Sequence, residues 1–226
     1  FFSRGMLIGT GTLPVTMIVG GLLSGLSFLQ IILQSLPVLL FCFLLMFGIW
    51  RFPEQTVRAF TVFADVIRLL TTIGLIAGAF CYMTGFSLLP DLAPLEDAMA
   101  VVSSIGIVLL GSLPAELLQR VLKKPLSFIG RKTGMNDSSA AGLLMGIVSP
   151  VPAITMMEKM DERGKIVNAT FLVSAASTIA AHMGFTFGTD PDFVVPLLVA
   201  KLAGGIAAVC AALFFTKKSA YSKTRK

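Results

Sequence analysis

Long apolar segments dominate this chain. Six stretches of about 20 mostly apolar residues recur, at 5–24, 28–49, 66–86, 98–118, 167–187 and 193–215. Lipid offers no hydrogen-bond partner to the backbone, so apolar stretches of this length cross a membrane as helices. Only 13% of residues are charged, against roughly 25% in soluble domains. We therefore predict an all-α, polytopic membrane protein with about six transmembrane helices in residues 1–216, followed by a basic tail at 217–226.

The N-terminal spans have local features of their own. Pro14 lies within the first apolar stretch, and we expect a kink there. Residues 53–68 alternate an apolar face, which includes Val57 and Phe60, with polar positions such as Glu54 and Arg58. This pattern predicts an amphipathic segment at the membrane interface, leading into the third span.

The stretch from residue 136 to 165 combines a helical pattern with a strong break. Small residues at 138–148 predict a helix, Asn136 begins an N-cap cluster, and a shorter helix is predicted at 153–160. The tetrapeptide Ser149-Pro150-Val151-Pro152 separates the two, because proline lacks the N–H that a helix interior requires. Broken backbone at membrane depth needs protein or a cavity around it, and transporters place their sites at such breaks.

Basic and acidic residues alternate between the loops. Lys and Arg without acids occupy 119–132 and the tail, whereas 84–97 and 188–192 carry acids without any basic residue. The positive-inside rule then places the tail in the cytoplasm and the acidic loops outside. If residues 136–160 form a re-entrant hairpin that starts and ends on the cytoplasmic side, the charges of every loop agree with this rule. The alternative is a full crossing, with one span wrongly assigned elsewhere.

Polar groups inside the apolar spans are candidates for function because they are costly in lipid. Lys201 lies about 12 Å into the last span. It belongs to a structural ion pair or helix-break contact, or to transport coupling, or else the boundary of the span is set wrongly. In the fifth span one helix face collects Asn168, Ser174, Ser177, Thr178 and His182. That stripe either lines a polar pathway or joins helices by hydrogen bonds. Glu116 is more typical of an interfacial position.

The break itself is suited to a small amine. The C-terminal end of the first half-helix offers unpaired carbonyls to an ammonium or a sodium ion, and the start of the second offers N–H groups. An amine with a hydroxyl would use both. A proline-kinked structural helix is the alternative.

Several classes of function find no support. The cysteines Cys42, Cys81 and Cys210 lie singly in apolar runs with one histidine in the chain, so we expect buried thiols and neither metal nor cofactor. No hydrolase, phosphate-loop or zinc motif is present, so no enzyme is predicted. The basic residues lie in loops between spans, which is typical of membrane topology and not of a nucleic-acid groove.

A family resemblance emerges from residues 134–205. Its pieces are Ala140-Ala141-Gly142, Pro152, Met156-Met157, Lys159-Met160-Asp161, Arg163-Gly164-Lys165, Asn168, Val173-Ser174-Ala175-Ala176, His182, Gly184-Phe185, Lys201-Leu202 and Gly204-Gly205. With Leu109-Leu110-Gly111 and Lys124-Pro125-Leu126 before them, they resemble the C-terminal half of the EutH-like ethanolamine-utilisation transport proteins. The chain departs from that pattern at Ser149-Pro150, where the family has asparagines, and at Ala180-Ala181, where it tends to have Gly-Asp.

The resemblance implies a multi-pass protein of the bacterial inner membrane that imports ethanolamine or a related small amino alcohol. Because the chain opens within an apolar span and without Met, we expect an N-terminal part of the same chain to precede it. The sequence leaves a homo-oligomer open. Rival functions are transport of another solute, such as an anion, and a non-transporting membrane subunit. The candidate substrate-binding residues are Ser149, Pro150, Pro152, Thr155, Asn168, Ser174, Ser177, His182 and Lys201.

Overall fold

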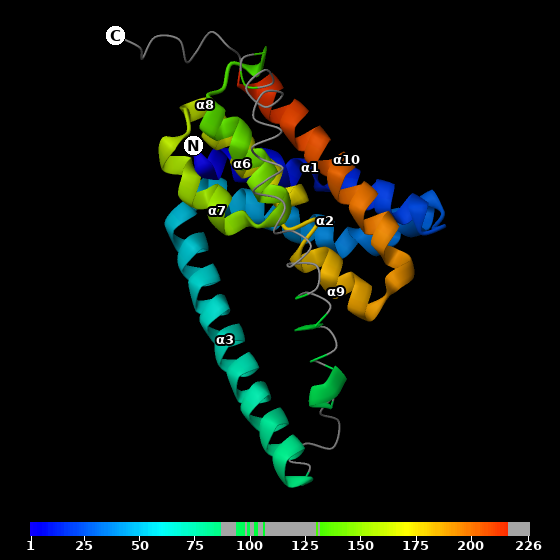
Figure 1. Ribbon diagram of the computed structural model, residues 1–226. Coiled ribbons are helices and arrows are strands. Elements are labelled where there is room, and N and C mark those ends of the chain that lie inside the picture. Colours follow the sequence, from blue (N-terminus) through cyan, green and yellow to red (C-terminus); the bar gives the residue numbers. More distant parts are fainter. Residues whose placement is uncertain are drawn as a thin grey trace.

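Helices account for every regular element in the part of the chain that the structure describes (Figure 1). The computed structural model describes residues 1–86, 94–97, 99, 102, 103, 106, 130 and 132–216. Its elements are α1 (Phe2–Leu23), α2 (Phe28–Arg51), α3 (Pro53–Thr84), α6 (Asp137–Val148), α7 (Pro150–Thr155), the 3-10 turn η1 (Met156–Lys159), α8 (Glu162–Ala175), α9 (Ala181–Thr189), the 3-10 turn η2 (Pro191–Phe193) and α10 (Val194–Phe215). The predicted all-α class is confirmed.

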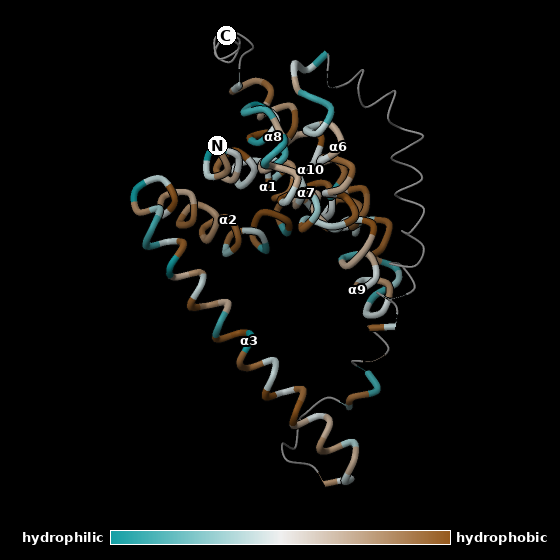
Figure 2. The backbone as a smooth tube through the Cα atoms, turned by 60° about the vertical axis from the view of Figure 1, so that its left-hand side comes forward, coloured by the Kyte–Doolittle hydropathy of each residue, from teal (hydrophilic) through white to brown (hydrophobic). Residues whose placement is uncertain are grey.

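Four described helical segments are long and apolar enough to cross a membrane: α1, α2, α3 and Pro191–Phe215. Apolar residues predominate along α2 and α10 in Figure 2, and α1 continues unbroken through Pro14. These helices are those of a multi-pass membrane protein. Most of the predicted fourth span at 98–118, Glu116 within it, and the basic tail at 217–226 lie outside the described residues.

The helices α1, α8 and α10 pack closely through small residues. A Cβ atom added at Gly5 would lie 2.5 Å from Ala169 Cβ, so the α1 and α8 backbones nearly touch. Thr170 Oγ1 uses this proximity to donate a hydrogen bond of 3.0 Å to the carbonyl oxygen of Gly5. Arg4 at the start of α1 donates to the carbonyl of Phe215 at the end of α10, so these helices are antiparallel. Small residues permit such contacts in membranes, where no hydrophobic effect draws helices together.

Helix α3 is a single rod, so the predicted amphipathic segment and the third span form one continuous helix. It runs without a break from Pro53 to the left-handed Gly85, a length of about 48 Å. In Figures 1 and 2 it extends away from the other helices, with its hydrophilic residues in the half nearer to α2. No helix-breaking residue occurs inside it, so nothing separates the two predicted parts.

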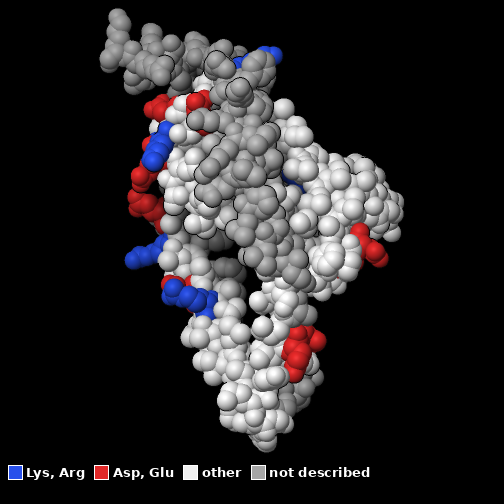
Figure 3. Space-filling model, in the orientation of Figure 1, with Lys and Arg blue, Asp and Glu red and all other residues white. Residues whose placement is uncertain are grey.

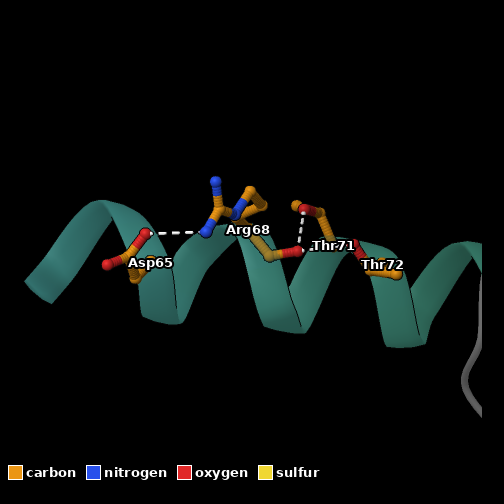
Figure 4. A network of polar contacts seen from close by, with 4 residues as sticks. All are labelled: Asp65, Arg68, Thr71 and Thr72. Atoms are coloured by element: carbon orange, nitrogen blue, oxygen red, sulfur yellow. Dashed lines mark hydrogen bonds and ion pairs between the residues drawn. The ribbon is translucent and has the colours of Figure 1, made fainter.

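Polar groups in the middle of α3 are paired with one another within the helix. Arg68 Nη2 lies 2.9 Å from Asp65 Oδ1, and the hydroxyls of Thr71 and Thr72 donate to the carbonyl of Arg68 (Figure 4). The side chains of Asp65 and Arg68 are both largely exposed, so this pair adds little to stability. Beyond Arg68 the helix carries no charged residue up to Thr84.

The predicted hairpin closes on itself. Asn136 Nδ2, before α6, donates a hydrogen bond of 2.9 Å to the carbonyl oxygen of Lys159, at the end of η1. Asp161 Oδ1 accepts from the Asn136 backbone N–H and from the Ser139 hydroxyl, and Asp161 also caps α8 through the Gly164 N–H. The two ends of residues 136–160 therefore lie next to each other, as a re-entrant hairpin requires. Helices α6 and α8 start side by side.

Candidate functional site

The first helix break occurs at Ser149, where the sequence predicts it. Ser149 is extended, with φ −152° and ψ 135°, and α7 begins directly at Pro150. Pro150 and Pro152 both lie in the first turn of α7, where no intrahelical N–H bond is needed. The predicted second half-helix at 153–160 is therefore corrected: α7 starts three residues earlier and ends at Thr155, and η1 follows it.

A second break, between α8 and α9, corrects the predicted continuous span at 167–187. Helix α8 ends at Ala175, Ala176 is extended with ψ 141°, and α9 starts at Ala181. Ser177 has φ 54°, in the left-handed region that a residue with a Cβ rarely adopts. The segment contains neither glycine nor proline, so its sequence gave no signal for this break.

The two breaks satisfy each other's backbone groups. In a continuous helix the Gly146 carbonyl would accept from the N–H of residue 150, but Pro150 has none. Ser177 N–H takes that place, 3.0 Å from Gly146 O. Likewise Ile179 N–H lies 3.2 Å from the carbonyl oxygen of Ile147, at the end of α6. Since an unpaired polar group in apolar surroundings costs several kcal/mol, this pairing explains how both breaks persist.

The paired breaks leave one backbone acceptor without a donor. The Val148 carbonyl has lost its helical donor, because residue 152 is also a proline, and no other donor reaches it among the described residues. The same two prolines remove two N–H groups from the first turn of α7. The Val148 carbonyl is therefore suited to a group that donates hydrogen bonds, such as an ammonium.

The predicted polar stripe does not exist as one face. Asn168 Nδ2 lies toward α6 and donates to the carbonyls of Ser139 and Gly164, at 2.8 and 2.9 Å. Ser174 instead lies beside α10, with its Cβ 3.3 Å from where a Cβ on Gly204 would stand. The helix also ends one residue after Ser174, so Ser177 and His182 cannot continue either face.

A pair of unsatisfied hydroxyls, one on α8 and one on α1, lies beside the second break. Ser174 Oγ and Thr16 Oγ1 are buried and lack any hydrogen-bond partner among the described residues. Both residues approach Gly204, whose missing side chain leaves room for Thr16 Oγ1 only 1.8 Å from the ideal Cβ position. Buried hydroxyls without partners are uncommon and call for an explanation, of which a bound polar molecule is one.

Other candidate residues occupy the edges of the breaks. His182 is exposed at the start of α9, and its Nδ1 lies 2.9 Å from the carbonyl oxygen of Ala176. Thr178 Oγ1 donates to the carbonyl of Ala175, which caps the end of α8. Thr155 is exposed and bonds only within α7, to the carbonyl of Pro152. The structure thus brings the 146–149 and 176–182 segments together, while Thr155 and Asn168 lie apart from them.

Lys201 lines a pocket of about 320 Å³ between α1, α2 and α10. The other polar side chains in its wall are Thr16, Gln34 and Ser35. The pocket lies near the second break, because Thr16 in its wall and Ser174 at the end of α8 both approach Gly204. Thr16 connects the pocket to Ser174 through Gly204.

Thr16, Gln34, Ser35 and Val148 are site residues that sequence reasoning missed. Gln34 and Ser35 gave a usable signal, since two adjacent polar residues interrupt an apolar run. Nothing in the described residues groups three or more potential metal ligands. Cys42 is buried as expected, but Cys210 is exposed on α10, because it faces away from the packed helices.

Comparison with known proteins assigns the chain to a family. The family described as "Ethanolamine utilisation protein, EutH" matches residues 1–215. The "Probable ethanolamine permease EutH" of Listeria monocytogenes is 36% identical over 96% of this chain and 59% of its own length. The protein of the same name in Escherichia coli is 32% identical over 100% of this chain and 61% of its own. An uncharacterized protein of Bacillus subtilis, YxeR, is 30% identical over 96% of this chain and 59% of its own.

The chain spans about three fifths of the length of these curated relatives. No solved structure matches it. The resemblance stated from the residues around Asn168 and His182 is confirmed by a match that covers nearly all of the sequence. This chain belongs to the EutH family of ethanolamine utilisation proteins.

Proposed function

We propose that this protein imports ethanolamine, or a closely related small amino alcohol, across the bacterial inner membrane. The observation that carries the proposal is the pairing of the two helix breaks, with an unpaired carbonyl and unsatisfied hydroxyls beside them. Curated members of the family are named as probable ethanolamine permeases. Transporters use discontinuous helices of this kind to contact substrate with backbone groups.

The chemistry of the paired breaks suits the two ends of ethanolamine. Its ammonium carries three donors, and the carbonyl of Val148 is an acceptor without a backbone donor in the described part of the chain. Its hydroxyl both donates and accepts, as the hydroxyls of Ser174 and Thr16 do. Ser149, Ser177 and His182 surround the same region and are proposed to shape it. A permease needs no chemical step, so no cofactor enters the proposal.

The orientation of the protein in the membrane is proposed from the distribution of its charged residues. In Figure 3 the visible Lys and Arg side chains lie mainly at the top and along the left-hand side, where acidic side chains are interspersed with them, and further acidic side chains lie on the right and below. The basic residues Lys159, Arg163 and Lys165 lie near the shared start of α6 and α8. By the positive-inside rule this end is proposed to face the cytoplasm, with the tail at 217–226 on the same side.

Uptake of radiolabelled ethanolamine into proteoliposomes tests the proposal. Ser174→Ala and Thr16→Ala are each expected to reduce uptake at low substrate concentration about tenfold, because each removes one hydrogen bond to the substrate. Thr72→Ala is the matched control, since its hydroxyl is already bonded within α3. Uptake that both site variants leave unchanged would contradict this site. Absence of any flux with the wild type would favour the non-transporting subunit.

A further inference from the structure

The pocket beside Lys201 is a second location where polar side chains lack partners. Its polar wall residues are Thr16 on α1, Gln34 and Ser35 on α2, and Lys201 on α10. None of these four side chains makes a hydrogen bond or an ion pair with the described residues. Ser35 is only 8% exposed.

An unpaired lysine at this depth is costly. Charged side chains in transmembrane helices normally pair with one another or with backbone carbonyls. Among the described residues no acidic side chain forms an ion pair with Lys201. The acids nearest in sequence, Asp190 and Asp192, are exposed in the loop before α10 and form no ion pair with any described residue. The pocket therefore has a positive charge and several donors, but no acid to balance them.

The remaining wall is apolar. It consists of the large apolar residues Met17, Leu26, Ile31, Phe193 and Leu197 and of the small residues Gly20, Gly21 and Ala200. At about 320 Å³ the pocket lies at the lower end of the range for small-molecule sites, roughly 300–1,000 Å³. A molecule that fits it would be small, negatively charged at one end and apolar at the other.

We propose that this space, the Lys201 pocket, binds a carboxylate with a short apolar chain. The carboxylate would accept from the Lys201 ammonium and from Ser35 or the Gln34 amide, and the chain would lie against Leu197 and Met17. Charge-assisted hydrogen bonds of this kind are the strong ones in proteins. This site shares Thr16 with the region proposed for the amine, but its charged group, Lys201, is not part of the paired breaks. It does not depend on that proposal: a protein that fails to bind ethanolamine is still expected to bind the carboxylate.

Thermal unfolding of the purified protein in nanodiscs of zwitterionic lipid tests this inference. Sodium butyrate is the probe, titrated at constant ionic strength against sodium chloride. Butyrate is expected to raise the unfolding midpoint in a saturable way, and Lys201→Met is expected to weaken its apparent affinity about tenfold or more. Lys159→Met is the matched control, because Lys159 is an exposed lysine outside the pocket.

Ser35→Ala provides a second variant that keeps the charge. It should weaken butyrate binding several-fold while leaving the midpoint without ligand nearly unchanged. A butyrate effect that is equal in Lys201→Met and wild type would overturn the proposal, as would the absence of any effect in the wild type. Equal stabilisation by chloride, or stabilisation that appears only when anionic lipid is added, would also overturn it, because the ligand would then be an inorganic anion or a lipid headgroup.

Discussion

Replacing Arg163 by methionine is expected to lower the free energy of unfolding by about 3 kcal/mol. Arg163 is 8% exposed. Its guanidinium donates to the carbonyl of Thr133, to the carbonyl of Leu213 at 3.2 Å and to the hydroxyl of Thr216 at 3.3 Å. These bonds join the start of α8 to the segment before α6 and to the end of α10.

Methionine preserves most of the apolar volume of arginine, so the predicted loss comes mainly from the hydrogen bonds. The carbonyls at the end of α10 would also lose a positive charge that opposes the negative end of the helix dipole. Unfolding in SDS, followed by circular dichroism, measures the change. Arg58→Met is the matched control, because Arg58 is exposed on α3. Equal stability of the two variants would show that Arg163 does not hold these helices together.

Gly9→Ala is expected to lower the free energy of unfolding by about 2 kcal/mol, although alanine is the better helix former. A Cβ on Gly9 would lie 2.6 Å from Val173 Cγ2 and 2.7 Å from the carbonyl oxygen of Thr170. The second of these atoms belongs to the α8 backbone, which cannot move without separating α1 from α8.

Gly11→Ala provides an internal control on the same helix. A Cβ there would meet nothing within 4 Å, so its effect should be neutral or slightly stabilising. The two variants are compared by the same SDS unfolding experiment. Similar effects at both positions would contradict the close packing of α1 on α8, whereas a loss confined to Gly9 would support it.

Sequence reasoning succeeded where local chemistry decides the structure. Apolar length predicted the membrane helices, and Pro150 with Pro152 located the first break, because proline cannot continue a helix. Asn136 was identified as an N-cap, and its side chain does accept from the N–H of Ser139.

The second break could not be predicted because its cause is not local. Residues 175–181 are rich in alanine, the best helix former, and their neighbours are unremarkable. The helix opens there because the freed carbonyls of Gly146 and Ile147, on a different helix, accept from Ser177 and Ile179. Tertiary hydrogen bonds thus override propensity, and the polar stripe predicted for an unbroken helix was wrong for the same reason.

The candidate site was predicted in part. Ser174, Ser177 and Lys201 are candidates because polar groups are rare in apolar spans, and Ser149 is one because it lies at the proline break; the structure places several of them near the breaks. Thr16 was missed, since a hydroxyl in an apolar helix usually bonds back to its own backbone, as Thr10 does to Met6. Its significance depends on Gly204 of α10, which the sequence of α1 cannot reveal.

Equilibrium binding of radiolabelled ethanolamine to the purified protein tests the central claim most directly. The account predicts saturable binding that 1-amino-2-propanol displaces, that acetate at equal concentration does not, and that Ser174→Ala weakens about tenfold. Choline, which has no N–H donors on its nitrogen, should compete poorly at the paired breaks. Absence of binding would contradict an amine site at the paired helix breaks. So would binding that acetate displaces and that Ser174→Ala leaves unaltered.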